Sequence, residues 1–287
     1  MPRSHTVPVA NLKINVLEWV GPDNAPTVLL QHGFLDVAAS WTPVAERLAE
    51  HWRVLAVDAR GHGDSDWVGD GGYYHFYDYM RDLTTVIETL VKTPLHLVGH
   101  SMGGMICAYY AGACPQEVAS FVCIEGLGPP AMDAEQAPAK LAIWIADLKR
   151  AETRKERRFA SLRDVADRLQ AQNNRLTEAT AHQLARWQTR LLEDGQRGWK
   201  FDPLHQTRSP QPVYEDHLRA FFSSITCPVL LVNGQASGFM HYFGDRASCF
   251  SNARSVTVDA AGHMIHHEQA ERLAELIESF ISENCDG

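Results

Sequence analysis

The pentapeptide Gly99-His100-Ser101-Met102-Gly103 constrains the fold of this chain more than any other feature of the sequence. An apolar run precedes it at residues 95–98 and a helix-like segment follows at residues 104–111, so the serine lies on a strand-to-helix turn. So sharp a turn strains the backbone of the serine, and it needs glycines on both sides because a β-carbon there collides with neighbouring elements. Free N–H groups and the positive dipole end of the helix favour negative charge beside the hydroxyl. The sequence therefore predicts an exposed, activated serine nucleophile at this turn.

Strand-like and helix-like segments alternate along most of the chain, which is typical of a parallel sheet covered by helices. We therefore predict an α/β fold with a mostly parallel central sheet and helices on both faces, and with residues 7–19 as an edge strand. Ligands of such sheets bind beyond the carboxyl ends of the strands, which is where Ser101 lies. The remaining strands are predicted at residues 27–31, 53–57, 95–98, 121–124, 228–232 and 255–258, and the helices at residues 41–51, 80–91, 104–111 and 268–282.

The alternation stops after residue 130 and resumes at residue 227. We therefore predict a core made of residues 1–130 and 227–287, interrupted by a helical insertion at residues 131–226. Residues 134–199 are charged, have helical periodicity and contain no predicted strand. Within the insertion, the basic segment from Lys149 to Arg163 is interpreted as the solvated face of a helix, with an anion-steering patch or a membrane-facing lid as the alternatives.

Composition excludes several classes of protein. A chain of 287 residues with 45% hydrophobic residues can bury a full core. A net charge of -9 argues against a nucleic-acid surface, which needs a basic footprint. No run approaches the roughly 18 apolar residues of a membrane span, and the N-terminus lacks the apolar stretch of a signal peptide, so we expect a cytoplasmic protein. Six cysteines, the last at position 285, lack paired metal spacing, so we expect free thiols, no metal and no cofactor.

Four motifs occur in an order that resembles the α/β-hydrolase superfamily. They are His32-Gly33-Phe34, the segment from Asp58 to Ser65, the serine pentapeptide and Gly262-His263. The resemblance covers nearly the whole chain and implies the α/β-hydrolase fold with the insertion as a helical cap over the active site. It further implies that Asp58 and Arg60 pin neighbouring loops. Esterases, lipases, peptidases, lactonases and carbon–carbon bond hydrolases share these motifs, so the substrate stays open.

Ser101 needs a general base, because a neutral hydroxyl is a poor nucleophile. His263 is the candidate, since it follows the last predicted strand on a loop that can lean back over the sheet. His266 and His267 are the alternatives, at the start of the last helix. His32 and His100 are interpreted as structural neighbours of the turns.

The acid that orients the histidine departs from the commonest family pattern. Many members of the superfamily carry Gly-x-x-Asp after the strand that follows the cap, but here Ser237 occupies the position of the aspartate. Other members place the acid after the strand that follows the nucleophile, where this chain has Glu125. We therefore predict that Glu125 orients His263, with Asp245 as the second candidate.

We expect the backbone N–H groups of Phe34 and Met102 to form the oxyanion hole. The substrate pocket is predicted to be apolar, which favours an ester with a hydrophobic group. Besides Phe34 and Met102, its predicted walls are Trp41, Leu127, Trp144, Trp187 and Met264.

Together these features predict a cofactor-independent serine hydrolase that acts through an acyl-enzyme on a small hydrophobic carboxylic ester. A lactone or carbon–carbon bond hydrolase would use the same residues. A ligand receptor and a cofactor-free dioxygenase, in which the serine does not react, are the alternatives of other classes. The partner in every case is a small molecule, and the sequence leaves the oligomeric state open.

Overall fold

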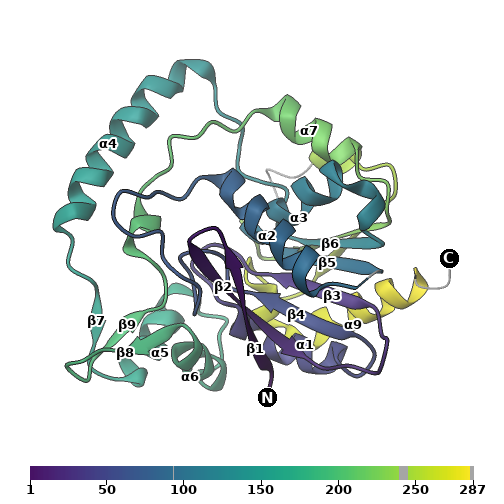
Figure 1. The fold of residues 1–287 in the computed structure, drawn as a ribbon, viewed down its shortest axis with the longest axis horizontal. Helices are drawn as coiled ribbons and strands as arrows, with labels where there is room; N and C mark the ends of the chain where they lie inside the picture. Colours follow the sequence, from purple (N-terminus) through teal and green to yellow (C-terminus); the bar gives the residue numbers. More distant parts are fainter. Residues whose placement is uncertain (93, 239–244, 285–287) are drawn as a thin grey trace.

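The computed structural model describes residues 1–92, 94–238 and 245–284. Within these residues, eight strands form one sheet in the order β1-β2-β4-β3-β5-β6-β10-β11 (Figure 1). β2 pairs antiparallel with both β1 and β4, and the other neighbours are parallel, which confirms the predicted mostly parallel sheet. The strands are β1 (Arg3–Val9), β2 (Leu12–Trp19), β3 (Thr27–Gln31), β4 (Arg53–Val57), β5 (Leu95–His100), β6 (Ser120–Ile124), β10 (Val229–Gly234) and β11 (Ala253–Val258).

The N-terminal edge differs from the prediction of one strand at residues 7–19. The chain turns there, and β1 and β2 form an antiparallel hairpin in which Val9 faces Leu12. Ala10 takes a positive φ of 53° at the turn, a conformation that a non-glycine residue rarely adopts. The prediction missed the turn because the segment carries no glycine at that position.

Helices cover both faces of the sheet. On one face, α2 (Phe76–Leu90), α3 (Met102–Ala113) and α7 (Glu215–Ser223) pack over alternate strand residues such as Leu29 and Leu97. On the other face, α1 (Thr42–Leu48), α8 (Ile265–Glu268) and α9 (Ala270–Glu283) pack over Val28 and Val98 (Figure 1). Successive strand residues thus face opposite layers, as the period of two in a buried strand requires. Because β3, β5, β6 and β10 run parallel, their carboxyl ends lie at the same edge of the sheet.

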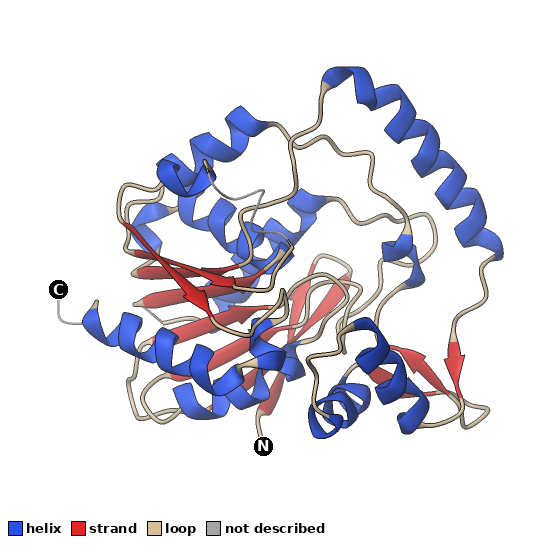
Figure 2. Cartoon of the chain, turned by 180° about the vertical axis from the view of Figure 1, so that it is seen from behind, coloured by secondary structure: helices blue, strands red, loops and turns tan. Residues whose placement is uncertain are grey.

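The insertion between β6 and α7 contains more than helices. It holds η3 (Ala134–Gln136), α4 (Ala137–Thr153), α5 (Leu162–Gln172), α6 (Glu178–Trp187) and η4 (Pro203–Gln206). It also holds a small antiparallel sheet of β7 (Arg158–Phe159), β9 (Arg197–Trp199) and β8 (Thr189–Leu191), so the expectation of no strand between residues 134 and 199 was wrong (Figure 2). These strands have two or three residues each, too few to produce a visible alternation in the sequence.

The end of the insertion also differs from the predicted boundary at residue 226. Leu218 and Phe222 of α7 belong to the core cluster of the main sheet, whereas the insertion has its own small core around Val165 and Leu184. α7 therefore belongs to the core by its packing, and the cap segment ends before residue 215.

The segment from Asp58 to Ser65 pins loops as expected. The Asp58 carboxylate accepts hydrogen bonds from the backbone N–H of Ala38 at 2.6 Å and the side chain of Asn15 at 2.8 Å. Arg60 forms a two-pronged ion pair with Asp82, with both N···O distances at 2.7 Å. These buried contacts fix the loops that leave β3 and β4.

None of the helices in the described part of the chain is long and apolar enough to cross a membrane. The cysteines at positions 107, 114, 123, 227 and 249 are free thiols, and Cys285 lies outside the described residues.

Candidate active site

Ser101 lies between the end of β5 and the start of α3, with φ 51° and ψ -116°. This conformation is strained for a residue with a side chain. A β-carbon at Gly99 would collide with the carbonyl group of Gly103, so the tight turn requires the glycine. The N–H of Ser101 donates to the carbonyl of Ile124 at 2.8 Å, which ties the serine to the end of β6. The predicted strand-to-helix turn is therefore present, with a half-buried serine at its tip.

The turn after β3 packs against this serine. A β-carbon added to Gly33 would lie 3.1 Å from Cβ of Ser101 and 2.6 Å from Nδ1 of His100, so only glycine allows the approach. Phe34 follows with its side chain 49% exposed, and Met102 is the first residue of α3. The N–H groups in the first turn of a helix lack partners within the helix. Of the two residues expected to form the oxyanion hole, Met102 thus follows Ser101 in the chain, and Phe34 follows the glycine that packs against it.

Glu125 follows β6 directly and its carboxylate is enclosed by three groups. Oε1 accepts a hydrogen bond from the N–H of Gly234 at 2.7 Å, and Oε2 accepts one from the hydroxyl of Ser237 at 2.7 Å. Nδ1 of His263 lies 3.3 Å from the same Oε2. The side chain of Glu125 is fully buried, so these contacts replace the water that a carboxylate needs. The structure therefore brings Glu125 and His263 together.

Ser237 is a residue whose part in this arrangement sequence reasoning missed. The sequence excluded it as a carboxylate, but its hydroxyl supports the carboxylate that lies on the neighbouring strand. The sequence could have predicted this contact, because a serine at the usual position of the acid can donate a hydrogen bond to an acid on the neighbouring strand. Asp245, the second candidate for the acid, lies exposed where η6 (Arg246–Cys249) begins, and its backbone carbonyl accepts the hydroxyl of Ser248 at 2.6 Å.

His263 lies on the loop between β11 and α8 with 24% of its side chain exposed. Its backbone carbonyl accepts a hydrogen bond from Nε2 of His100 at 2.8 Å. Burial holds the pKa of His100 well below its usual range, so His100 is neutral and carries its proton on Nε2. His100 thus positions the loop of His263, in agreement with its interpretation as a structural neighbour of the turns.

His266 and His267 make a different set of contacts. Nε2 of each faces Oδ2 of Asp36, at 2.8 Å for His266 and 3.2 Å for His267. Among the described residues, these three form a cluster of possible metal ligands, whose ligand atoms lie within 4.8 Å of one another. Ser40 also donates to Oδ2 at 2.9 Å, and Gln188 donates to Oδ1 at 2.9 Å, so both oxygens of the carboxylate accept hydrogen bonds.

The five residues expected to line the pocket lie in different places. Trp41 is fully buried and stacks on His266 with ring centroids 4.5 Å apart, so it belongs to the core and offers no surface to a substrate. Leu127 is 4% exposed and packs in the core cluster above the sheet. Trp187 packs against the small core of the cap. Trp144 of α4 meets Tyr73 edge to face at 5.3 Å, and Met264 is half-buried at the start of α8.

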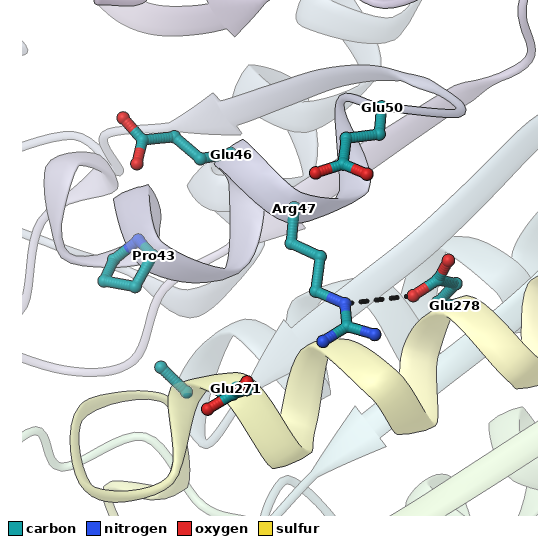
Figure 3. Close-up of a pocket in the computed structure, with 7 residues that line it drawn as sticks. Pro43, Glu46, Arg47, Glu50, Glu271 and Glu278 are labelled. Carbon is teal, nitrogen blue, oxygen red and sulfur yellow. Dashed lines mark hydrogen bonds and ion pairs between the residues drawn. The ribbon is translucent and has the colours of Figure 1, made fainter.

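Two surface pockets lie away from these residues. One lies between α1 and α9, and Figure 3 shows Arg47 paired with Glu278 in it. Its volume is about 560 Å³, and Nε of Arg47 lies 3.0 Å from the Glu278 carboxylate. A second, of about 260 Å³, lies in the insertion and is lined in part by residues 154–157 of the basic segment. Neither contains Ser101, Glu125 or His263. The first is lined by Pro43, Glu46, Arg47, Glu50, Ala270, Glu271 and Glu278, and the second by Arg154, Lys155, Glu156, Arg157, Trp199, Phe201, Pro203 and Gln206.

Comparison with known proteins identifies relatives over most of the chain. The sequence model of the alpha/beta hydrolase fold matches residues 26–270. A 2-(acetamidomethylene)succinate hydrolase of Mesorhizobium japonicum is 27% identical over 97% of this chain and 95% of its own length. An esterase of Mycobacterium tuberculosis is 26% identical over 92% of this chain and 85% of its own. Among solved structures, the thioesterase domain from the curacin biosynthetic pathway superposes with a TM-score of 0.86 at 26% identity, covering 97% of this chain and 99% of that domain.

Proposed function

The chain belongs to the α/β-hydrolase fold family, and on that premise we propose that it is a serine hydrolase that cleaves a small hydrophobic carboxylic ester through an acyl-enzyme. The observation that carries the proposal is the buried carboxylate of Glu125, which lies 3.3 Å from Nδ1 of His263 and follows the strand end that binds the backbone of Ser101. Hydrolases with esterase and thioesterase names among the relatives support the same acyl-transfer chemistry.

In this mechanism, Nε2 of His263 removes the proton of the Ser101 hydroxyl as Oγ attacks the ester carbonyl. The carbonyl oxygen becomes an oxyanion, which the backbone N–H groups of Phe34 and Met102 stabilise. His263 then gives its proton to the departing alcohol, which leaves the acyl group on Ser101. Water repeats the sequence and releases the acid. Glu125 holds Nδ1 protonated throughout and stabilises the imidazolium.

The acyl or alcohol group of the substrate is proposed to lie against Phe34, Trp144 and Met264. Phe34 supports this best, because a large apolar side chain that is 49% exposed beside the serine turn gains contact area when a hydrophobic group binds. A thioester would use the same atoms, since only the leaving group changes. The chain length of the substrate is left to experiment.

The test is fluorophosphonate labelling, followed by turnover of p-nitrophenyl esters of graded chain length and of an acyl-N-acetylcysteamine thioester. We expect labelling and ester turnover in the parent protein. In Ser101→Ala we expect no labelling, and only the residual turnover, roughly 10³–10⁴ over water, that binding and the oxyanion hole sustain. A Ser101→Ala variant that keeps near-parent ester turnover would overturn the acyl-enzyme. A parent protein that binds ligand but is neither labelled nor active would support a receptor.

A further inference from the structure

The carboxylate of Asp36 joins three separate parts of the chain. Asp36 is 1% exposed on the loop after β3, and its Oδ1 accepts a hydrogen bond from Nε2 of Gln188 at 2.9 Å. Gln188 is the residue that ends α6 in the cap. On the other side, Oδ2 accepts hydrogen bonds from His266 and His267, which begin α8, and from Ser40. The cap and the start of α8 are therefore held by opposite oxygens of one buried carboxylate.

Asp36 is linked by contacts to both halves of the proposed machinery. Its own N–H donates to the carbonyl of Gly33 at 3.3 Å, in the turn that packs against Ser101. His266 lies three residues after His263, and its ring lies 4.5 Å from that of His100, the residue that holds the His263 carbonyl. Asp36 therefore connects, through its backbone and its side chain, the turn before Phe34 with the loop that carries His263.

The charges in the cluster are fixed by burial and hydrogen bonding. Burial by itself raises the pKa of Asp36. The neighbouring charge of His267 and the hydrogen bonds from both histidines lower the pKa and together outweigh burial, so it lies well below the usual range. Burial lowers the pKa of His266 to about 4. At neutral pH the cluster therefore holds an ionised carboxylate and a neutral His266 that donates from Nε2. Leaving a buried carboxylate short of donors is costly, so all four donors are held in place.

We propose that Asp36 is a positioning residue that couples the seating of the cap, through Gln188, to the placement of the proposed base His263, through His266 and His267. The proposal rests on the serine-hydrolase function proposed above. A cap that seats correctly completes the hydrogen bonds of Asp36 and so fixes the histidine loop. A cap that is displaced leaves one carboxylate oxygen unpaired and loosens that loop.

A double-mutant cycle across the carboxylate tests the coupling. Gln188→Met removes the donor from the cap, and His267→Leu removes one from α8, while both keep similar volume. Gln188 and His267 bind different oxygens of Asp36, so two independent structural roles would give effects on kcat that multiply. We expect each single variant to lower kcat about three- to tenfold with KM within about twofold, and the double variant to lose at least threefold less than the product.

Asp36→Asn supplies the second measurement. The amide nitrogen of the new asparagine must face either the donor from Gln188 or the donors from His266 and His267, so one of these hydrogen bonds is lost. We expect kcat to fall about 10- to 100-fold with little change in KM, since the loss of one buried charged partner misplaces the base without touching substrate. Glu18→Gln is the control: it is a buried carboxylate, 7% exposed, that binds Arg53 at the amino end of β4, on the edge of the sheet opposite this cluster, so it loses stability but keeps kcat. Urea midpoints confirm that each variant is folded under assay conditions.

The outcomes separate this proposal from the proposed function. If fluorophosphonate labels the parent but the cycle is multiplicative, or if Asp36→Asn keeps parent kcat, the coupling is wrong while the hydrolase function stands. If the parent is not labelled at all, the proposed function is wrong. Zn²⁺ that alters the activity of the parent but not of Asp36→Asn would show that the cluster is a metal site, which also overturns the coupling.

Discussion

The replacement of Glu125 by glutamine tests the least common feature of the proposed site. In the parent, Oε1 accepts the N–H of Gly234 at 2.7 Å, so the oxygen of the new amide must take that position. The amide nitrogen then occupies the place of Oε2, between Ser237 and Nδ1 of His263. A donor at that place forces Nδ1 to accept, which moves the imidazole proton to Nε2. His263 can then no longer remove the proton of Ser101.

The magnitude follows from these contacts. Wrong-tautomer substitution lowers kcat on the order of 10⁴-fold in the serine-protease triad, equivalent to about 5.5 kcal/mol of transition-state stabilisation. KM should change by less than about threefold, because 3.3 Å is long for a charge-assisted hydrogen bond and the contact strengthens only as the imidazolium forms. Stability should fall by about 1 kcal/mol, since the contacts to Gly234 and Ser237 are kept.

The assay compares kcat of Glu125→Gln and Asp245→Asn on one p-nitrophenyl ester, at urea concentrations where both variants are fully folded. Asp245→Asn is the matched control, and we expect it to keep parent activity. The double variant Glu125→Gln with Ser237→Asp should regain part of the rate, because the Ser237 hydroxyl lies only 2.7 Å from Oε2. If Glu125→Gln stays within about threefold of the parent while Asp245→Asn loses activity, the acid has been assigned to the wrong strand.

Three further outcomes are expected. Exhaustive dialysis against EDTA should leave ester turnover unchanged, because the proposed steps use only side chains and backbone N–H groups; loss of activity that zinc restores would contradict them. Burial lowers the pKa of His96 to about 4, of His205 to about 3 and of His266 to about 4, so the unfolded chain binds protons that the folded chain does not. The free energy of unfolding should therefore fall as the pH drops from about 6.5 towards 4, by up to about 1.4 kcal/mol per pH unit for each histidine, and urea midpoints at pH 7, 6 and 5 would reveal a flat profile if this were wrong. Gly99→Ala should cost about 1–3 kcal/mol and lower kcat, because its β-carbon meets backbone in α3, whereas Gly238→Ala, whose β-carbon would meet none of the described residues within 4 Å, should do neither; equal urea midpoints for the two variants would refute the steric argument.

The parallel core was predictable because its signals are local. β3 and β4 have the predicted bounds, residues 27–31 and 53–57, since each is a short apolar run that ends at a polar or glycine-rich turn. The sharp features at Ala10 and in the small cap sheet were not predictable in this way. The strands of the cap sheet are stabilised by pairing with a distant segment, as when Phe159 pairs with Arg197, and such short strands have no period of their own. The turn at Ala10 joins two consecutive strands, but no glycine marks it in the sequence.

The candidate site shows the same division. The serine turn could be predicted in detail because glycine, serine and the following helix are consecutive in the chain. The place of Trp41 could not be predicted, because the sequence after the turn at Gly33 looks the same whether the aromatic residue lines a pocket or stacks on a buried histidine. The Asp36 cluster was invisible for a different reason: its members, Gln188 among them, lie up to 231 residues apart.

The register of the sheet explains why an acid on either of two strands serves one histidine. β6 and β10 are parallel neighbours in which Ile124 faces Val232, so Glu125 is the first residue beyond that pair on its strand. Neighbouring strands lie only about 4.8 Å apart, and the loop after β10 turns back so that Ser237 reaches the carboxylate of Glu125. An acid at Ser237 and an acid at Glu125 thus converge on one point beside His263. The longer side chain of Glu125 covers the added distance from the neighbouring strand. Ser237, which stands at the position where many members of the superfamily carry the acid, donates a hydrogen bond to that carboxylate.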